Sequence, residues 1–406
     1  MSRTLPALRA HLDLMPSPLP ETPGLVIRDP FRYADAMLVL PPPLIPCLML
    51  FDGAHDEGDL RVVLSRITDT VEVGDIARHL VDTLSGSGFL QDPVFERLRD
   101  DRHRAFAAAE RREPVHAGSG YPDDPGELRE WAARCLAEGP SLPADEGTLV
   151  GIAAPHVSPD GGSRSYAAAY GALTPDLGDR TFVILGTSHY GTPGRFGLTR
   201  KPFATPFGTT TVDTARIDAL IAEGGPSVAA EDYCHAMEHS IEFQVVFLQH
   251  LYGAGVRIVP ILCGPLGAGV RRPPPARDAD TQRFLDTLAR VCASPGEVIW
   301  VAGIDMAHVG ERYGDGIAAF ADEGPMKDVA VQDIARCERI TAGDADGFWT
   351  LIDVDGEGDP LSWCGSSATY ALLAAARPRR GVMRHYEQWN IDPGSVVTFA
   401  GMAFYR

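Results

Sequence analysis

The chain has 406 residues, of which 45% are hydrophobic and 22% charged, a composition typical of a globular protein rather than of a disordered or fibrous one. Its 55 acidic residues outnumber the 36 basic ones. The resulting formal net charge of −19 argues against a general binder of nucleic acids or anionic membranes. At this length we expect more than one domain.

The amino terminus carries no long apolar run and is interrupted by Pro6, so we predict neither a signal peptide nor a membrane span. The seven cysteines are widely scattered and include no Cys-x-x-Cys pair, which argues against a disulfide framework. The sequence therefore predicts a reduced, cytoplasmic protein.

The first 92 residues differ in character from the rest. Residues 1–24 are rich in proline, which predicts an extended arm or a loosely docked tail. Within residues 25–92 we predict a strand at 36–40, helices from the spacing of apolar residues at 60–67 and 76–84, and a closing strand at Phe89-Leu90. Two or three helices with short strands favour a small winged-helix-type (α+β) domain.

This segment resembles the PqqD-like peptide-recognition domains of peptide-modifying enzymes. The phrases that carry the resemblance are Leu50-Phe-Asp-Gly53 and Gly88-Phe-Leu90, with Leu60, Ile76 and Leu80 between them. The resemblance implies that residues 25–92 bind a peptide or a partner protein. Acidic side chains outnumber the arginines here, which disfavours a winged helix that reads DNA.

Residues 93–111 have helical spacing and predict a linker helix, followed by a large domain over 112–406. In that domain two buried strands are predicted at residues 149–154 and 182–185, and histidines follow them at His156 and His189. A third predicted strand, at 297–302, precedes Asp305-Met-Ala-His308. Open α/β sheets bind ligands beyond the carboxyl ends of their strands, so three such histidines suggest one site.

Two further residues could join this site. His239 lies between Glu238 and Glu242 in a segment that we predict to be helical. Cys364 precedes an alanine-rich helix, and a thiolate at a helix amino terminus has a lowered pKa and binds metals well. A single histidine or cysteine in such a position is more often a packing or capping residue. Composition and spacing alone therefore indicate only a metal-binding α/β protein.

A set of short phrases resembles the Memo family, also called AmmeMemoRadiSam system protein B, over residues 112–406. The phrases, in the order of that family, are Pro114-Val-His-Ala-Gly-Ser-Gly-Tyr-Pro122, Ala154-Pro-His156, Leu185-Gly-Thr-Ser-His189, Glu238-His-Ser-Ile-Glu-Phe-Gln244, Asp305-Met-Ala-His308, Cys364-Gly-Ser366 and Ser395-Val-Val-Thr-Phe-Ala400.

The resemblance implies a fold similar to the class III extradiol dioxygenases, with a mixed sheet flanked by helices. It further implies that His156, His189 and Cys364 bind the metal, the cysteine standing where those dioxygenases have a carboxylate. His239 would be the acid/base group, and Asp305 and His308 would line the site. This chain departs from the family pattern at residues 157–162 and at Gly120, or at Gly118 if the register is shifted, so a substrate cannot be carried over from a relative.

Three functions follow as hypotheses. The first is a non-haem Fe(II) oxygenase-like enzyme that acts on a small aromatic or peptide-borne substrate delivered by residues 25–92, with His239 moving a proton. The second is an adaptor without turnover, in which a redox metal, iron or copper, is sequestered and the amino-terminal domain binds a partner. The third is a zinc hydrolase, because two histidines and a cysteine also form catalytic zinc sites.

Overall fold

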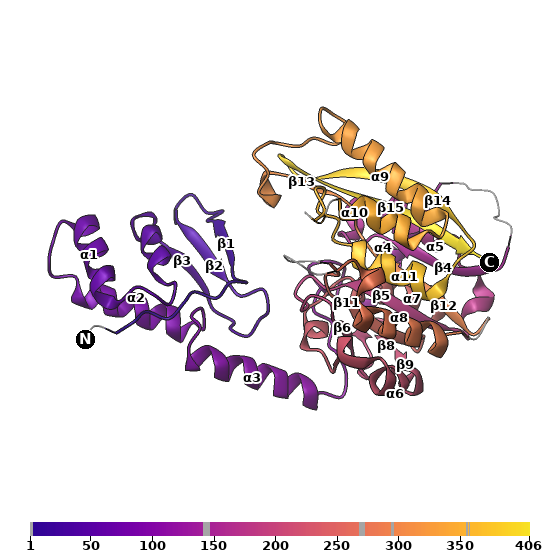
Figure 1. The fold of residues 1–406 in the computed structure, drawn as a ribbon, viewed down its shortest axis with the longest axis horizontal. Coiled ribbons are helices and arrows are strands. Elements are labelled where there is room, and N and C mark those ends of the chain that lie inside the picture. Colours follow the sequence, from indigo (N-terminus) through magenta and orange to yellow (C-terminus); the bar gives the residue numbers. More distant parts are fainter. Residues whose placement is uncertain (1–2, 141–146, 268–272, 294–295, 355, 357) are drawn as a thin grey trace. The chain divides into compact units, whose positions relative to one another are not determined.

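The protein is described by a computed structural model, which covers residues 3–140, 147–267, 273–293, 296–354, 356 and 358–406 (Figure 1). The chain divides into two compact units, Met1–Ala108 and Ala109–Arg406. The division lies close to the boundary expected at residue 112. None of the described helices is long and apolar enough to cross a lipid bilayer.

The small unit contains a three-stranded antiparallel sheet followed by helices. Its elements are β1 (Asp13–Pro16), β2 (Leu25–Arg28), β3 (Met37–Leu40), the 3-10 helix η1 (Pro42–Leu50), α1 (Glu57–Thr68), α2 (Gly74–Gly86) and α3 (Pro93–Ala108). The helix expected as a linker is α3, and it belongs to the small unit. The winged-helix and PqqD-like assignments stay predictions.

Two expectations for the small unit are corrected. Residues 1–24 are not a separate arm, because Leu5 is buried in the core of the unit, Arg9 forms a buried ion pair with Asp29 at 2.9 Å, and β1 pairs with β2. Prolines signal an extended backbone, and an extended backbone can also be a paired strand. Leu90 forms only an isolated bridge with Leu8 rather than a closing strand.

The large unit is built around a ten-stranded mixed sheet. Its strands are β4 (Leu149–Ala154), β5 (Thr181–Thr187), β6 (Phe196–Leu198), β9 (Thr211–Val212), β10 (Val228–Ala230), β11 (Arg257–Cys263), β12 (Val298–Gly303), β13 (His308–Gly310), β14 (Arg380–Asp392) and β15 (Ser395–Tyr405). The strands β7 (Ala204–Thr205) and β8 (Gly208–Thr209) form a separate pair. The helices are α4 (Pro125–Ala137), α5 (Pro159–Tyr170), α6 (Thr214–Glu223), α7 (Glu242–Tyr252), α8 (Ala279–Val291), α9 (Met326–Thr341), α10 (Ala345–Ile352) and α11 (Ser366–Ala376).

Helices cover both faces of this sheet (Figure 1). Residues of β5 alternate between the faces: Phe182 and Ile184 pack with residues of α4, α5 and α7, whereas Val183 and Leu185 pack with residues of α6, α8 and α11. Burial on both faces explains why the central strands appear in the sequence as continuous apolar runs. The expected mixed α/β sheet with flanking helices is confirmed.

The central strands β11, β5, β12 and β4 are neighbours in that order and run parallel. Their pairing register sets Gly186 opposite Gly303, and Gly303 opposite Ala154. The carboxyl ends of these strands therefore form one row at the edge of the sheet. The residues that follow them, among them His156 and His189, meet at this edge.

A buried ion pair ties the start of the large unit to α7. The guanidinium of Arg112 donates to the carboxylate of Glu242, and both side chains are almost fully buried. The backbone N–H groups of Val115 and His116 and the hydroxyl of Tyr121 donate to the same carboxylate. Because α7 begins at Glu242, this network fixes the helix that directly follows the segment carrying His239.

We predict that Glu242→Ala destabilises the large unit by about 3–5 kcal/mol, because it leaves the Arg112 charge buried without a partner. All five tryptophans lie in the large unit, so tryptophan fluorescence during urea unfolding reports on this unit alone. Glu223→Ala, which removes an exposed ion pair with Arg290, is the matched control and should cost less than about 1 kcal/mol. Equal unfolding midpoints for the two variants would contradict the prediction.

Candidate metal centre

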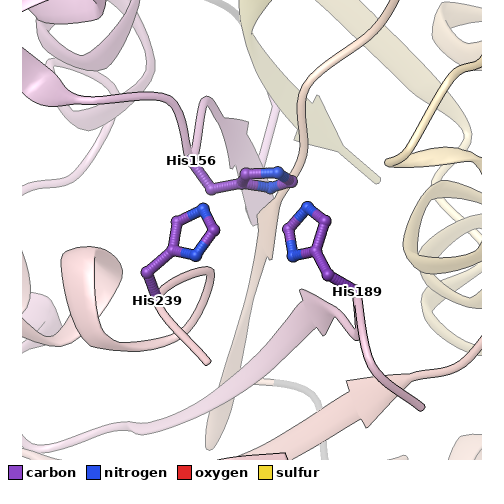
Figure 2. A group of neighbouring side chains, drawn as sticks. All are labelled: His156, His189 and His239. Atoms are coloured by element: carbon purple, nitrogen blue, oxygen red, sulfur yellow. The ribbon is translucent and has the colours of Figure 1, made fainter. Parts of the chain in front are cut away.

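Three histidine rings converge beyond the carboxyl ends of the central strands (Figure 2). The ring centroids of His156 and His189 lie 5.0 Å apart, those of His156 and His239 5.3 Å, and those of His189 and His239 5.0 Å. One nitrogen from each ring lies within 4.8 Å of the others. The rings of His189 and His239 are nearly parallel, and that of His156 is almost perpendicular to both.

Hydrogen bonds fix which nitrogen of each ring carries the proton. Nδ1 of His156 lies 2.9 Å from the carbonyl oxygen of Gly303, which can only accept, so this nitrogen donates. Nδ1 of His189 and Nδ1 of His239 lie 2.9 and 3.2 Å from the same carboxylate oxygen of Glu238. In its neutral form each ring therefore carries its proton on Nδ1 and offers the lone pair of Nε2, which is the tautomer that metal-binding histidines adopt.

Glu238 is the site residue that the sequence reasoning did not assign. Its carboxylate is buried and also accepts the backbone N–H groups of His189 and His239, at 2.9 and 3.0 Å. One side chain thus orients two imidazoles and the backbone that carries them. The signal in the sequence was the position of Glu238 directly before His239. Metal-binding histidines usually donate their second ring N–H to a nearby carboxylate or carbonyl.

His239 does not lie on a helix as expected. It lies in the turn before α7, and this turn packs against the strand ends. The hydroxyl of Ser240 donates to the carbonyl of Thr187 at 2.7 Å. A Cβ at Gly303 would lie 2.4 Å from the carbonyl oxygen of Ser240, so glycine is required for this close approach.

Cys364 joins the cluster through His156. Its Sγ lies 3.3 Å from Nε2 of His156, and Asp305 Oδ2 lies 3.5 Å from the same nitrogen. Among the residues that the structure describes, His156, Asp305 and Cys364 form a second group of ligand atoms within 4.8 Å of one another. The expected set of His156, His189 and Cys364 is thus divided between two groups that share His156, and it stays a prediction.

The loop before α11 holds Cys364 close to Asp305. The N–H of Gly365 donates to the carbonyl of Asp305 at 3.1 Å, and a Cβ at Gly365 would lie 2.5 Å from that oxygen. The Asp305 carboxylate in turn accepts the N–H groups of His156 and Val157 at 2.9 and 3.1 Å. Asp305 therefore connects the end of β4 with the cysteine loop.

The charges in the cluster are strongly coupled. Burial alone would lower the pKa of His189, but the Glu238 carboxylate beside it outweighs burial and holds that pKa well above its usual range. Burial opposes the ionised form of Glu238 as well, and the charge of His189 outweighs it, so the pKa of Glu238 lies well below its usual range. Burial and its two histidine neighbours lower the pKa of His156. Without a metal, the cluster contains a cationic His189, an anionic Glu238 and a neutral His156.

Burial also shifts the pKa values of the thiol and of the carboxylate near it. It raises the pKa of Asp305 to about 6, against the two backbone hydrogen bonds from His156 and Val157. It raises the pKa of the Cys364 thiol, against the influence of His189. The lowered cysteine pKa that we expected from the nearby helix amino terminus is therefore wrong for the metal-free protein, because burial dominates.

His308 lies outside both groups of ligand atoms. It begins β13, its Nδ1 lies 2.9 Å from the carbonyl of Met306, and its ring contacts Tyr313 edge to face at a centroid distance of 4.9 Å. Burial lowers the pKa of His308 to about 4, so the ring is neutral at pH 7. The expectation that His308 lines the site stays a prediction.

We predict that Glu238→Gln weakens Zn(II) or Fe(II) binding by about 10–100-fold while the fold is retained. The amide keeps the shape of the side chain but loses the charge and one of the two acceptor oxygens that orient His189 and His239. Competition with a chromophoric chelator measures the affinity. Glu231→Gln, at a half-buried carboxylate that bonds Thr199 and Arg200, is the control and should bind like the unaltered protein. Unchanged affinity in Glu238→Gln would refute the orienting role.

Metal binding should release protons at pH 7. The pKa values of His189 and Cys364 are both raised, so both groups are protonated without a metal and must lose a proton to act as ligands. Affinity should therefore rise with pH and fall in acid. Calorimetric titrations in buffers of different ionisation enthalpy count the released protons. Binding without proton release would contradict the assignment of these two ligands.

Comparison with known proteins identifies the family of this chain. The family model described as Memo-like protein matches residues 112–403. A MEMO1 family protein of Aquifex aeolicus is 24% identical over 388 residues, covering 94% of this chain and 96% of the relative. Relatives of the same description from Desulfurococcus amylolyticus and Methanopyrus kandleri are 27% and 31% identical, each covering 73% of this chain and 99% of the relative. The match to the Aquifex relative extends into the small unit, whereas the family model starts at Arg112. This chain belongs to the Memo-like protein family.

Proposed function

We propose that the chain is a metal-dependent enzyme of the non-haem iron oxygenase type. The observation that supports it is the convergence of three imidazole Nε2 atoms and one thiol at the strand ends, with every imidazole Nδ1 already engaged. Because Nδ1 of each ring faces an oxygen acceptor, Nε2 is the nitrogen that each neutral ring can offer to an ion or to a substrate proton.

The donor atoms fit a first-row transition metal. Imidazole nitrogen and thiolate sulfur suit iron, zinc or copper, whereas magnesium and calcium prefer oxygen ligands. We assign His156, His189 and Cys364 as the ligands. When bound, ferrous iron would supply redox chemistry with dioxygen and a substrate.

The surrounding residues can handle substrate and protons. His239 is 31% exposed at its side chain and His189 28%, so the imidazole side of the cluster is open to solvent. His239 presents an Nε2 that can accept a proton from a substrate. Asp305, with a pKa raised to about 6, can hold or release a proton near neutrality. His308 is neutral at pH 7 and can accept a hydrogen bond.

A cavity of about 360 Å³ borders Cys364 and offers room for a small molecule. Two indoles, Trp349 and Trp363, contribute to its walls, which suits an aromatic or largely apolar substrate. We propose a small aromatic or peptide-borne substrate on these grounds. The small unit would bind the peptide or partner protein that carries it.

Two alternatives make different predictions for the same residues. The group of three imidazoles favours zinc as well, because three histidines that leave one position open form catalytic zinc sites that hydrolyse substrates. A sequestering adaptor would enclose its metal, and the exposure of His189 and His239 speaks against an enclosed ion.

We predict that protein loaded anaerobically with Fe(II) binds about one iron per chain and takes up oxygen in an iron-dependent manner. His156→Ala and Cys364→Ala should lose the metal. His239→Ala should keep the metal and lose turnover, because His239 moves a proton rather than binding the ion. His385→Ala, at a histidine on β14 outside both ligand groups, is the control for loss of an imidazole.

Each contrary result has a distinct meaning. Protein that binds no iron refutes the proposed function. Purified protein that retains zinc and gains no oxygen uptake with iron supports the hydrolase. Bound iron without oxygen uptake, in the unaltered protein and in all variants, supports the adaptor.

A further inference from the structure

A buried carboxylate outside the proposed centre is connected to two of the segments that form it. Asp333 lies on α9 and has no solvent-exposed surface. Its Oδ1 accepts the indole N–H of Trp363 at 2.8 Å, and its Oδ2 accepts the hydroxyls of Thr398 and Tyr386 at 2.6 and 2.8 Å. A buried aspartate is costly unless hydrogen bonds satisfy its carboxylate, and here three side chains do so.

The first of these hydrogen bonds reaches the cysteine loop. Trp363 immediately precedes Cys364, and its ring is buried. A second contact from α9 supports the same loop: Arg336, one helical turn after Asp333, forms an ion pair with Asp359 at 2.7 Å. The Asp359 carboxylate in turn accepts the backbone N–H of Trp363 at 2.7 Å. Both ends of the Trp363 residue, ring and backbone, are therefore fixed by α9.

The second hydrogen bond reaches the segment that carries Asp305 and His308. The Thr398 hydroxyl that donates to Asp333 also accepts the backbone N–H of Ala307 at 2.9 Å. The backbone of Thr398 pairs with this segment as well, donating to the carbonyl of Ala307 and accepting from the N–H of Met306. Through Thr398 on β15, the Asp333 carboxylate therefore also holds the segment that carries Asp305 and His308.

We infer that Asp333 is a positioning residue of the metal centre: through Trp363 and Thr398 it holds Cys364 at a fixed place relative to Asp305 and His156. The inference rests on the metal centre proposed above. The thiol at 3.3 Å from His156 Nε2 is the contact that this arrangement secures. The third donor, Tyr386, lies on β14, which carries none of the proposed site residues.

The chain offers matched variants that separate positioning from stability. Trp363→Phe deletes the hydrogen bond that connects Asp333 to the cysteine loop. Tyr386→Phe deletes a hydrogen bond to the same carboxylate from β14, which carries none of the proposed site residues. Trp131→Phe removes the same atoms from a second buried indole, which donates to the Asp160 carboxylate at 2.9 Å and lines neither the cavity beside Cys364 nor either group of ligand atoms. Asp333→Leu removes the acceptor itself, and Trp363→Phe keeps the test open if Asp333→Leu does not fold.

Two readouts are measured on the full chain. The first is the rate of alkylation of Cys364 by iodoacetamide in the metal-free protein, followed by mass spectrometry; the other six cysteines are buried. The second is Co(II) titration, in which the thiolate-to-cobalt charge-transfer absorption reports the sulfur–metal bond. In Trp363→Phe and in folded Asp333→Leu we expect alkylation to be about tenfold faster and Co(II) binding about tenfold weaker, with an altered charge-transfer band. Tyr386→Phe and Trp131→Phe should stay within about twofold of the unaltered protein in both readouts.

The double variant Asp333→Leu with Trp363→Phe should be no more affected than the stronger single variant, because both changes delete the same hydrogen bond. The inference is overturned if Trp363→Phe matches the unaltered protein, or if Trp131→Phe or Tyr386→Phe changes both readouts as much. Failure of the unaltered protein to bind Co(II) would refute the metal centre. The alkylation rates, which need no metal, would still decide whether Asp333 fixes the cysteine.

Discussion

An imidazole binds a metal only through a nitrogen that carries no proton, and in this chain hydrogen bonds decide which nitrogen that is. The Gly303 carbonyl accepts a hydrogen bond from Nδ1 of His156, and one oxygen of Glu238 accepts hydrogen bonds from Nδ1 of His189 and Nδ1 of His239. Without these acceptors the rings could rotate or change tautomer, and their Nε2 atoms would no longer share one space. The roles assigned to the three imidazoles therefore depend on one carbonyl and one carboxylate.

The fold supplies these acceptors because it aligns strand ends. Parallel strands in register put the carbonyl of Gly303 beside the end of β4, where His156 follows. The turn before α7 reaches the same edge through Ser240 and brings Glu238 over the end of β5. Glycine at position 303, where a Cβ would lie 2.4 Å from the carbonyl oxygen of Ser240, permits this close packing of backbone on backbone.

The sequence was informative where the signal is local. Buried strands appear in the sequence as apolar runs, so the positions of His156 and His189 after their strands followed from the pattern. Cys364 was a candidate from its place before a predicted helix, and the family resemblance added the expectation that it binds the metal. The sequence failed where partners lie far apart in the chain. Residues 238–240 have helical spacing, but the bond from Ser240 to Thr187, 53 residues away, holds them in a turn. Asp333 gave no signal at all, since its three donors come from three separate segments.

The ion pair between Arg112 and Glu242 has a consequence for where the large unit can be separated from the small one. The contact boundary falls after Ala108, and the family model starts at Arg112. A shortened chain that starts between these positions keeps the arginine, the two backbone N–H donors and Tyr121 that together enclose the carboxylate. A chain that starts a dozen residues later would lack these donors and leave the Glu242 carboxylate without partners in the core. It would still contain every proposed metal ligand.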